Sequence, residues 1–175
     1  MSETTRLLIH GASGRMGQAL LRLCADQTDC VVVAAVTNRS PVQRVVDGVP
    51  FFAAKELSGV PAFDVAIDFS LQEGFDPILA LCVARGAALV SGTTGLSEAQ
   101  RAALELASQR IPVLWASNFS LGVAVLTELV ERAAAALPGW DCDVVEAHHT
   151  QKKDAPSGTA LTLGAAAAAN GAKVS

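Results

Sequence analysis

The sequence predicts an α/β fold, in which a doubly wound parallel sheet is followed by a smaller α+β unit. Strand-like and helix-like segments alternate along the 175 residues, which is typical of parallel β-α-β units joined by right-handed crossovers. Several strand-like segments are continuous apolar runs, as expected where helices cover both faces of a sheet. Apolar residues make up 51% of the chain and charged residues 17%. Charged residues usually reach about 25%, so this balance suits a large buried sheet.

The strands are predicted from short runs of apolar or β-branched residues. Residues 31–36, with the sequence VVVAAV, form the clearest run, and residues 49–53 give a weaker signal. The predicted strands are residues 7–10, 31–36, 49–53, 65–69, 88–91 and 111–116 in the first sheet, and residues 143–147 in the second unit.

The helices are predicted from apolar residues at helical spacing and from end signals. Met16, Leu20 and Leu23 share one face of the first helix, Ser97 is a candidate N-cap, and Gly86 ends a helix. The predicted helices are residues 15–25, 77–85, 97–109, 122–136 and 157–169.

Composition and charge exclude several classes of partner. The formal net charge is −4, and no basic face suited to nucleic acid is recognisable. No apolar run approaches the ~20 residues of a membrane span. The polar first residues lead directly into a strand, so we expect no signal peptide. Cys24, Cys30, Cys82 and Cys142 have neither CxxC nor disulfide-framework spacing, which indicates reduced thiols and a cytoplasmic protein.

A glycine-rich turn joins the first predicted strand to the first predicted helix. Gly11 suits a tight turn, Gly14 lets a pyrophosphate approach the backbone, and Gly17 lets the helix pack close to the strand. The start of the helix offers free N–H groups to an anion. The pattern predicts a Rossmann-like nucleotide-binding domain, although an ordinary strand–helix turn is the alternative. The complete turn reads Gly11, Ala12, Ser13, Gly14, Arg15, Met16 and Gly17.

The end of the second strand bears on which dinucleotide binds. NAD enzymes usually carry a carboxylate there for the ribose hydroxyls, but this strand ends in Thr37 and Asn38, followed by Arg39. An arginine can pair with a 2′-phosphate. We therefore expect NADPH or NADH with NADPH favoured, and a solvated Arg39 would leave the preference open.

A second cluster combines cationic residues with the start of a helix. Ser157, Gly158 and Thr159 open the last helix, and hydroxyls and N–H groups at a helix start bind anions. Two histidines and two lysines precede this helix start in the chain. Together these groups could bind a small dicarboxylate, and a histidine could also transfer a proton. Simpler alternatives are solvated lysines and a plain helix cap. No metal site is expected, because His148 and His149 are adjacent and would point to opposite faces of a strand. The cluster comprises His148, His149, Lys152, Lys153, Ser157, Gly158 and Thr159.

These residues closely resemble one family, 4-hydroxy-tetrahydrodipicolinate reductase, also called dihydrodipicolinate reductase. Four segments carry the resemblance in the family's order: GASGRMG at 11–17, DFS at 68–70, GTTG at 92–95 and EAHHTQKKDAPSGTA at 146–160. NFSLGV at 118–123 is a weaker fifth match. The longest segment is highly specific to the family.

The resemblance implies the reduction of a cyclic imine dicarboxylate to tetrahydrodipicolinate, in diaminopimelate and lysine biosynthesis. His148 corresponds to the proton donor, and Lys152 to its catalytic partner. Gly11, Arg15 and Met16 would surround the pyrophosphate. The nicotinamide side would be lined by Phe69, Gly92, Thr94, Ala116 and Phe119, and the substrate would be held by His149, Lys152, Ser157, Gly158, Thr159 and Thr94.

The resemblance also implies a domain organisation. We expect a dinucleotide-binding Rossmann domain at residues 1–118 and the first part of a substrate-binding domain at 119–175. Family members continue further, so we expect the second domain to be incomplete here. A homotetramer is implied for the full-length family. Two alternatives stay open: another Rossmann oxidoreductase acting on an imino or amino acid, and an inactive nucleotide-binding fragment.

Overall fold

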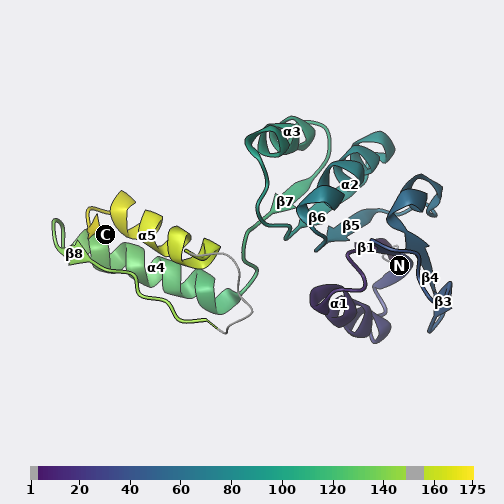
Figure 1. The fold of residues 1–175 in the computed structure, drawn as a ribbon, viewed down its shortest axis with the longest axis horizontal. Helices are drawn as coiled ribbons and strands as arrows, with labels where there is room; N and C mark the ends of the chain where they lie inside the picture. The colour runs from purple at the N-terminus through teal and green to yellow at the C-terminus, as the bar shows by residue number, and fades with distance from the viewer. Residues whose placement is uncertain (1–3, 149–155) are drawn as a thin grey trace. The chain divides into compact units, whose positions relative to one another are not determined.

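The computed structural model describes residues 4–148 and 156–175 of the chain. The chain divides into two compact units, Met1–Ala116 and Ser117–Ser175 (Figure 1). The assignment of residues 1–118 and 119–175 as functional domains stays a prediction.

The first unit is built on a seven-stranded sheet with the order β3-β4-β2-β1-β5-β6-β7. Every neighbouring pair is parallel except β3 and β4, which run antiparallel at one edge. The predicted α/β class is therefore confirmed. The strands are β1 Thr5–His10, β2 Cys30–Thr37, β3 Val45–Val46, β4 Val49–Ala53, β5 Val65–Asp68, β6 Ala88–Ser91 and β7 Val113–Trp115.

Helices cover both faces of this sheet, which makes it doubly wound. Alternate residues of β1 point to opposite faces, and Leu8 and Ile9 accordingly belong to separate buried clusters. Leu20 of α1 packs against the cluster that contains Ile9, whereas Phe75 of α2 and Ala107 of α3 belong to the cluster that contains Leu8. The helical segments are α1 Arg15–Ala25, the short 3-10 helix η1 Ala54–Gly59, α2 Gln72–Arg85 and α3 Glu98–Ser108.

The strand order reverses between β1 and β5. From β1 the chain passes through α1 to β2 on one side, and β5 then lies on the other side of β1. In open α/β sheets, ligands bind in the crevice at the carboxyl ends of the strands where this reversal occurs. The turns that follow His10 and Asp68 flank that crevice.

The second unit is a helix pair with a small parallel sheet. Helices α4, Leu121–Ala136, and α5, Gly158–Ala169, contact each other, and β8, Asp141–Cys142, pairs with β9, Lys173–Val174. Several large apolar side chains of this unit are exposed, among them Leu121, Leu129, Trp140 and Leu161. Within the described residues, no helix is both long and apolar enough to span a membrane.

Two predicted elements differ from the structure. Helix α2 begins at Gln72 rather than at residue 77, so Pro77 lies inside it. Proline favours the first helical turn, because inside a helix it removes one backbone hydrogen bond and its ring crowds the carbonyl four residues earlier, and this preference led to the predicted start at residue 77. The strand predicted at 143–147 is wrong, because β8 is formed by Asp141–Cys142. The two-residue strands β3, β8 and β9 are too short for apolar periodicity to reveal.

Helix α1 packs close to the turn before it, and Gly17 is the contact point. A Cβ atom at Gly17 would lie 2.4 Å from the carbonyl oxygen of Gly11 and 2.6 Å from the Cα atom of Ala12. Neither backbone atom can move without displacing the turn.

We therefore expect Gly17→Ala to destabilise the fold by about 1–3 kcal/mol, as overpacking does. A thermal melt followed by circular dichroism measures this change. Gly59→Ala is the matched control, because a Cβ atom there meets nothing within 4 Å, and its effect should stay within about 0.5 kcal/mol. Equal melting curves for both variants would contradict the close packing of α1.

Candidate functional site

The glycine-rich turn is held against the end of β2 by backbone hydrogen bonds. The amides of Gly11 and Ala12 both donate to the carbonyl oxygen of Val36, at 3.0 and 2.9 Å. Gly11 has a φ of +80°, and a Cβ atom there would lie 2.5 Å from the carbonyl oxygen of Phe69. Only glycine combines this conformation with so close an approach. The turns after β1 and β5 are therefore in direct backbone contact.

The start of α1 is available to an anion. Its N-cap is Gly14, which has no side chain to cap the helix. The first turn of any helix leaves N–H groups without intrahelical partners, and these carry a partial positive charge. The predicted phosphate cradle thus has its backbone donors in place, and Arg15 stands at the first position of the helix.

Two adjoining hollows open beside this turn. One is a cleft of about 270 Å³, and the other is a hollow of about 510 Å³ that contains Arg39. Ser13 and Asn38 line both. The cleft has mainly apolar walls from η1, from α2 and from the turn after β5, and the hollow lies along the loop after β2. Together they extend from the glycine turn to Arg39.

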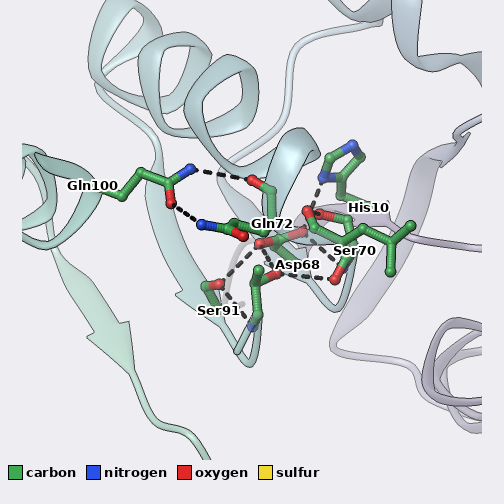
Figure 2. A network of polar contacts seen from close by, with 8 residues as sticks. His10, Asp68, Ser70, Gln72, Ser91 and Gln100 are labelled. Atoms are coloured by element: carbon green, nitrogen blue, oxygen red, sulfur yellow. Dashed lines mark hydrogen bonds and ion pairs between the residues drawn. The ribbon is translucent and has the colours of Figure 1, made fainter. Parts of the chain in front are cut away.

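A buried carboxylate ties the ends of three neighbouring strands together (Figure 2). Asp68 at the end of β5 is completely buried, and its Oδ1 atom lies 2.9 Å from Nδ1 of His10 at the end of β1. Its Oδ2 atom accepts hydrogen bonds of 2.8 Å from the hydroxyls of Ser91, at the end of β6, and Thr93. The amide of Ser70 donates to Oδ1 at 3.0 Å.

This network keeps Asp68 ionised. Burial alone would raise the pKa of a carboxyl group, but the hydrogen bonds and charge of His10 and the hydrogen bonds from Ser70 and Thr93 outweigh burial and lower the pKa of Asp68. Sequence reasoning missed His10 and Ser91, and noted Asp68 and Thr93 only as parts of family segments, without giving them a role. The available signal was a polar residue closing each of three apolar strands, namely His10, Asp68 and Ser91.

The residues expected on the nicotinamide side lie partly together. Gly92 lies against the ring of Phe69, because a Cβ atom at Gly92 would be 2.2 Å from Cε1 of that ring. The amide of Gly92 donates to the carbonyl oxygen of Asp68, and that of Ala116 donates to Ser91. Thr94 is exposed nearby in the chain. Phe119 belongs to the second unit.

In the second unit, Glu146 links His148 to the start of α5. One carboxylate oxygen of Glu146 accepts from the amide of Ser157 at 2.8 Å, and the other lies 3.7 Å from Nδ1 of His148. The hydroxyl of Ser157 caps the helix by accepting from the amide of Ala160 at 3.0 Å. Ser157 thus forms the helix cap that was the simpler alternative to an anion site, and its own amide is bonded to Glu146.

Thr159 and Asn118 complete the described part of this cluster. Nδ2 of Asn118 donates to the hydroxyl of Thr159 at 3.1 Å, and Oδ1 of Asn118 accepts from the amide of Ser120 at 2.8 Å. His149, Lys152 and Lys153 lie outside the described residues, so their predicted roles stay predictions. Among the residues the structure describes, no cluster suited to a metal ion occurs.

The comparisons with known proteins decide the family. Models described as "Dihydrodipicolinate reductase, N-terminus" and "Dihydrodipicolinate reductase, C-terminus" match residues 5–119 and 122–174. The chain belongs to the dihydrodipicolinate reductase family. This membership makes it an NAD(P)H-dependent oxidoreductase, as the resemblance implied, with the Rossmann-like fold that the glycine turn predicted.

Individual relatives agree with this family. The chain is 78% identical over 175 residues to the 4-hydroxy-tetrahydrodipicolinate reductase of Stenotrophomonas maltophilia strain K279a, covering 99% of this chain and 73% of the relative. Identity to the enzyme of the same name from Xylella fastidiosa strain M23 is 64%, over 98% of this chain and 72% of the relative. A dipicolinate-bound dihydrodipicolinate reductase from Paenisporosarcina sp. TG-14 superposes with a TM-score of 0.76 at 26% identity, over 95% of this chain and 66% of that one.

The buried carboxylate predicts how stability depends on pH. Because the fold lowers the pKa of Asp68 below its ordinary 3.8, ionised Asp68 stabilises the folded state above that pH. This contribution disappears as the pH falls through the lowered pKa. Glu56 and Asp64 act in the same direction, since hydrogen bonds from Arg44 and Arg6 respectively lower their pKa to about 2.

We expect Asp68→Asn to lower the free energy of unfolding by about 3 kcal/mol at neutral pH, as loss of one partner of a buried pair does. The loss should be smaller in acid. Urea unfolding can be followed by Trp115 fluorescence in a Trp140→Phe background, since the chain has 2 tryptophans. Asp76→Asn, an exposed change in α2, is the control. An equal loss at acid and neutral pH would contradict this account.

Proposed function

We propose that this chain reduces 4-hydroxy-tetrahydrodipicolinate, a cyclic imine dicarboxylate, to tetrahydrodipicolinate, in diaminopimelate and lysine biosynthesis. The observation that carries the proposal is the uncapped start of α1, which meets a cleft at the reversal of strand order in a chain of this family. The 78% identity to a relative of that name supports the substrate. The residues proposed for the cofactor and substrate sites are part of the same proposal.

The residues of the first unit fit a dinucleotide. The turn at Gly11, Ala12, Ser13 and Gly14 offers backbone donors to a pyrophosphate, and Gly17 lets α1 pack closely enough to present them. Arg15 and Met16 begin the helix beside it. For the nicotinamide side we propose Phe69, Gly92, Thr94 and Ala116, together with Phe119 of the second unit. When bound, the reduced nicotinamide supplies the hydride.

The residues of the second unit fit a dicarboxylate and a proton donor. The amides of Gly158 and Thr159 lie in the first turn of α5, where no intrahelical acceptor exists, and Thr159 adds a hydroxyl that Asn118 holds in place. His148 is proposed as the proton donor, and its Nδ1 atom lies 3.7 Å from a carboxylate oxygen of Glu146. The resemblance alone supports Lys152 as the catalytic partner of His148. It also supports the proposed substrate contacts of His149, Lys152, Ser157 and Thr94.

We expect His148→Gln to lower turnover by at least about 100-fold, the usual contribution of a general acid. The assay follows the loss of reduced nicotinamide absorbance with freshly prepared substrate. Glu128→Gln, an exposed change in α4, should leave the rate unchanged. Undiminished turnover in His148→Gln would contradict the proton-donor role.

A second candidate is a nucleotide-binding unit without turnover. The exposure of Leu121, Leu129 and Trp140 favours it. The unit that carries the dicarboxylate site buries its large apolar side chains less completely than the unit that carries the cofactor site. The same exposed residues also support a homo-oligomer, for which the full-length family's tetramer is the expectation. This candidate would be supported if the wild-type chain bound NADPH but did not oxidise it in the presence of the substrate.

NADPH is the proposed preference over NADH. Arg39 lines the larger hollow beside Asn38 and Ser40, where the loop after β2 carries no carboxylate to bind ribose hydroxyls. A guanidinium pairs well with a 2′-phosphate. A cytoplasmic location is proposed as well, and the free state of all four cysteines agrees with it.

We expect Arg39→Ala to weaken NADPH binding by about tenfold, the effect of losing one charge-assisted hydrogen bond. NADH binding should change by less than about twofold. Titration calorimetry gives both dissociation constants. Arg101→Ala, which removes an exposed arginine from α3, is the matched control. If Arg39→Ala weakened the two cofactors equally, Arg39 would not be the residue that selects NADPH.

A further inference from the structure

We propose that His10 is a cofactor-binding residue: its Nε2 atom forms a hydrogen bond with a ribose–phosphate oxygen of the dinucleotide. Asp68 is the positioning residue that holds the ring in place. This proposal rests on the proposed function, since it needs a dinucleotide in the cleft beside the glycine turn.

The position of His10 places one edge of its ring at the cleft. It is the last residue of β1, directly before Gly11, and it lines the cleft of about 270 Å³ together with Ser13 and Gly14. The residue is only 4% exposed. In Figure 2, one ring nitrogen faces Asp68 and the other points away from the network.

The network fixes what each ring nitrogen can do. Ionised Asp68 can only accept hydrogen bonds, so Nδ1 of His10, at 2.9 Å, carries a hydrogen. Nε2 is then an acceptor when the ring is neutral and a donor when it is protonated. Within the described residues, Nε2 has no hydrogen-bond partner. No buried side-chain nitrogen or oxygen of the described residues lacks a partner, so Nε2 is reachable from the cleft, where a ligand can bond to it.

The charges around the ring determine how binding and protonation are linked. Asp68 faces it from β5, and Glu73 lines the same cleft from the first turn of α2. The loop after β2 contributes the neutral Asn38, and η1 contributes the apolar Ala54 and Leu57. A bound pyrophosphate adds negative charge beside Nε2, so the complex favours the protonated ring more than the free protein does. Binding therefore takes up protons.

Two substitutions separate the parts of this proposal. In His10→Asn, the amide can still donate to Asp68, but no polar group reaches the cleft. In His10→Gln, the longer amide can reach the ligand but cannot titrate. Calorimetric titration with NADPH, in two buffers of different ionisation enthalpy, measures both the dissociation constant and the number of protons taken up. Thermal melts establish that each variant is folded.

For the wild type we expect net proton uptake near neutral pH and tighter binding at about pH 6 than at about pH 8, across the range where histidine titrates. His10→Asn should lose the uptake and bind NADPH about tenfold more weakly at the lower pH, as the loss of a charge-assisted hydrogen bond predicts. His10→Gln should lose the uptake but retain more of the affinity. Arg101→Ala, which changes an exposed residue of α3, should keep the wild-type uptake.

The outcomes distinguish this proposal from the proposed function. Wild-type affinity and proton uptake in folded His10→Asn would overturn the role of His10 while leaving cofactor binding intact. Wild-type proton uptake in folded His10→Gln would also overturn it, because the group that takes up the proton would then not be His10. A wild-type chain that binds neither NADPH nor NADH would refute the proposed function itself.

Discussion

The carboxylate of Asp68 is buried completely at the point where β1, β5 and β6 end side by side. A buried charge is tolerated only when its hydrogen-bonding capacity is met. Here the ring of His10, the amide of Ser70 and the hydroxyls of Ser91 and Thr93 meet it. Since each partner stands at or just after a strand end, the requirement to pair this single charge fixes where three of the crevice turns begin.

The consequences extend through backbone contacts to the ligand-facing groups. The turn after Asp68 places the carbonyl of Phe69 where only a glycine at position 11 can meet it. The ring of Phe69 in turn occupies the space above Gly92. Trp115 donates from its indole nitrogen to the carbonyl of Thr93 at 3.0 Å, which brings the end of β7 into the same assembly. Such preorganisation means that little rearrangement is needed at the crevice when a ligand binds.

Much of the first unit could be predicted from the sequence, because its signals are local. Apolar runs located β2 and β6, and the N-cap Ser97 located α3, where its hydroxyl accepts from the amide of Gln100. The buried polar network could not be predicted in the same way. His10 and Asp68 are 58 residues apart, and nothing local shows that their strands are neighbours. Register across a parallel sheet is a tertiary property.

The second unit was harder to predict for a related reason. The segment after β8 has the apolar and β-branched character of a strand around Val144 and Val145, yet Val145 is almost fully exposed and unpaired with β9. Propensity describes how well a residue fits a half-buried pleated surface. Where the described chain offers no such surface, propensity alone does not make a strand.

The buried carboxylate also creates a problem that the adjoining residues must solve. A dinucleotide pyrophosphate beside the glycine turn brings negative charge toward Asp68, and two like charges repel more strongly in a medium of low polarity than in water. The partial positive charge at the start of α1 favours the phosphate, but it does not neutralise Asp68. The ring of His10, which is bonded to the carboxylate on one edge and open to the cleft on the other, lies where a compensating charge has most effect. A hydroxyl or amide at position 10 could donate a hydrogen bond to Asp68. Only a group able to carry a positive charge could also reduce the repulsion between Asp68 and the pyrophosphate.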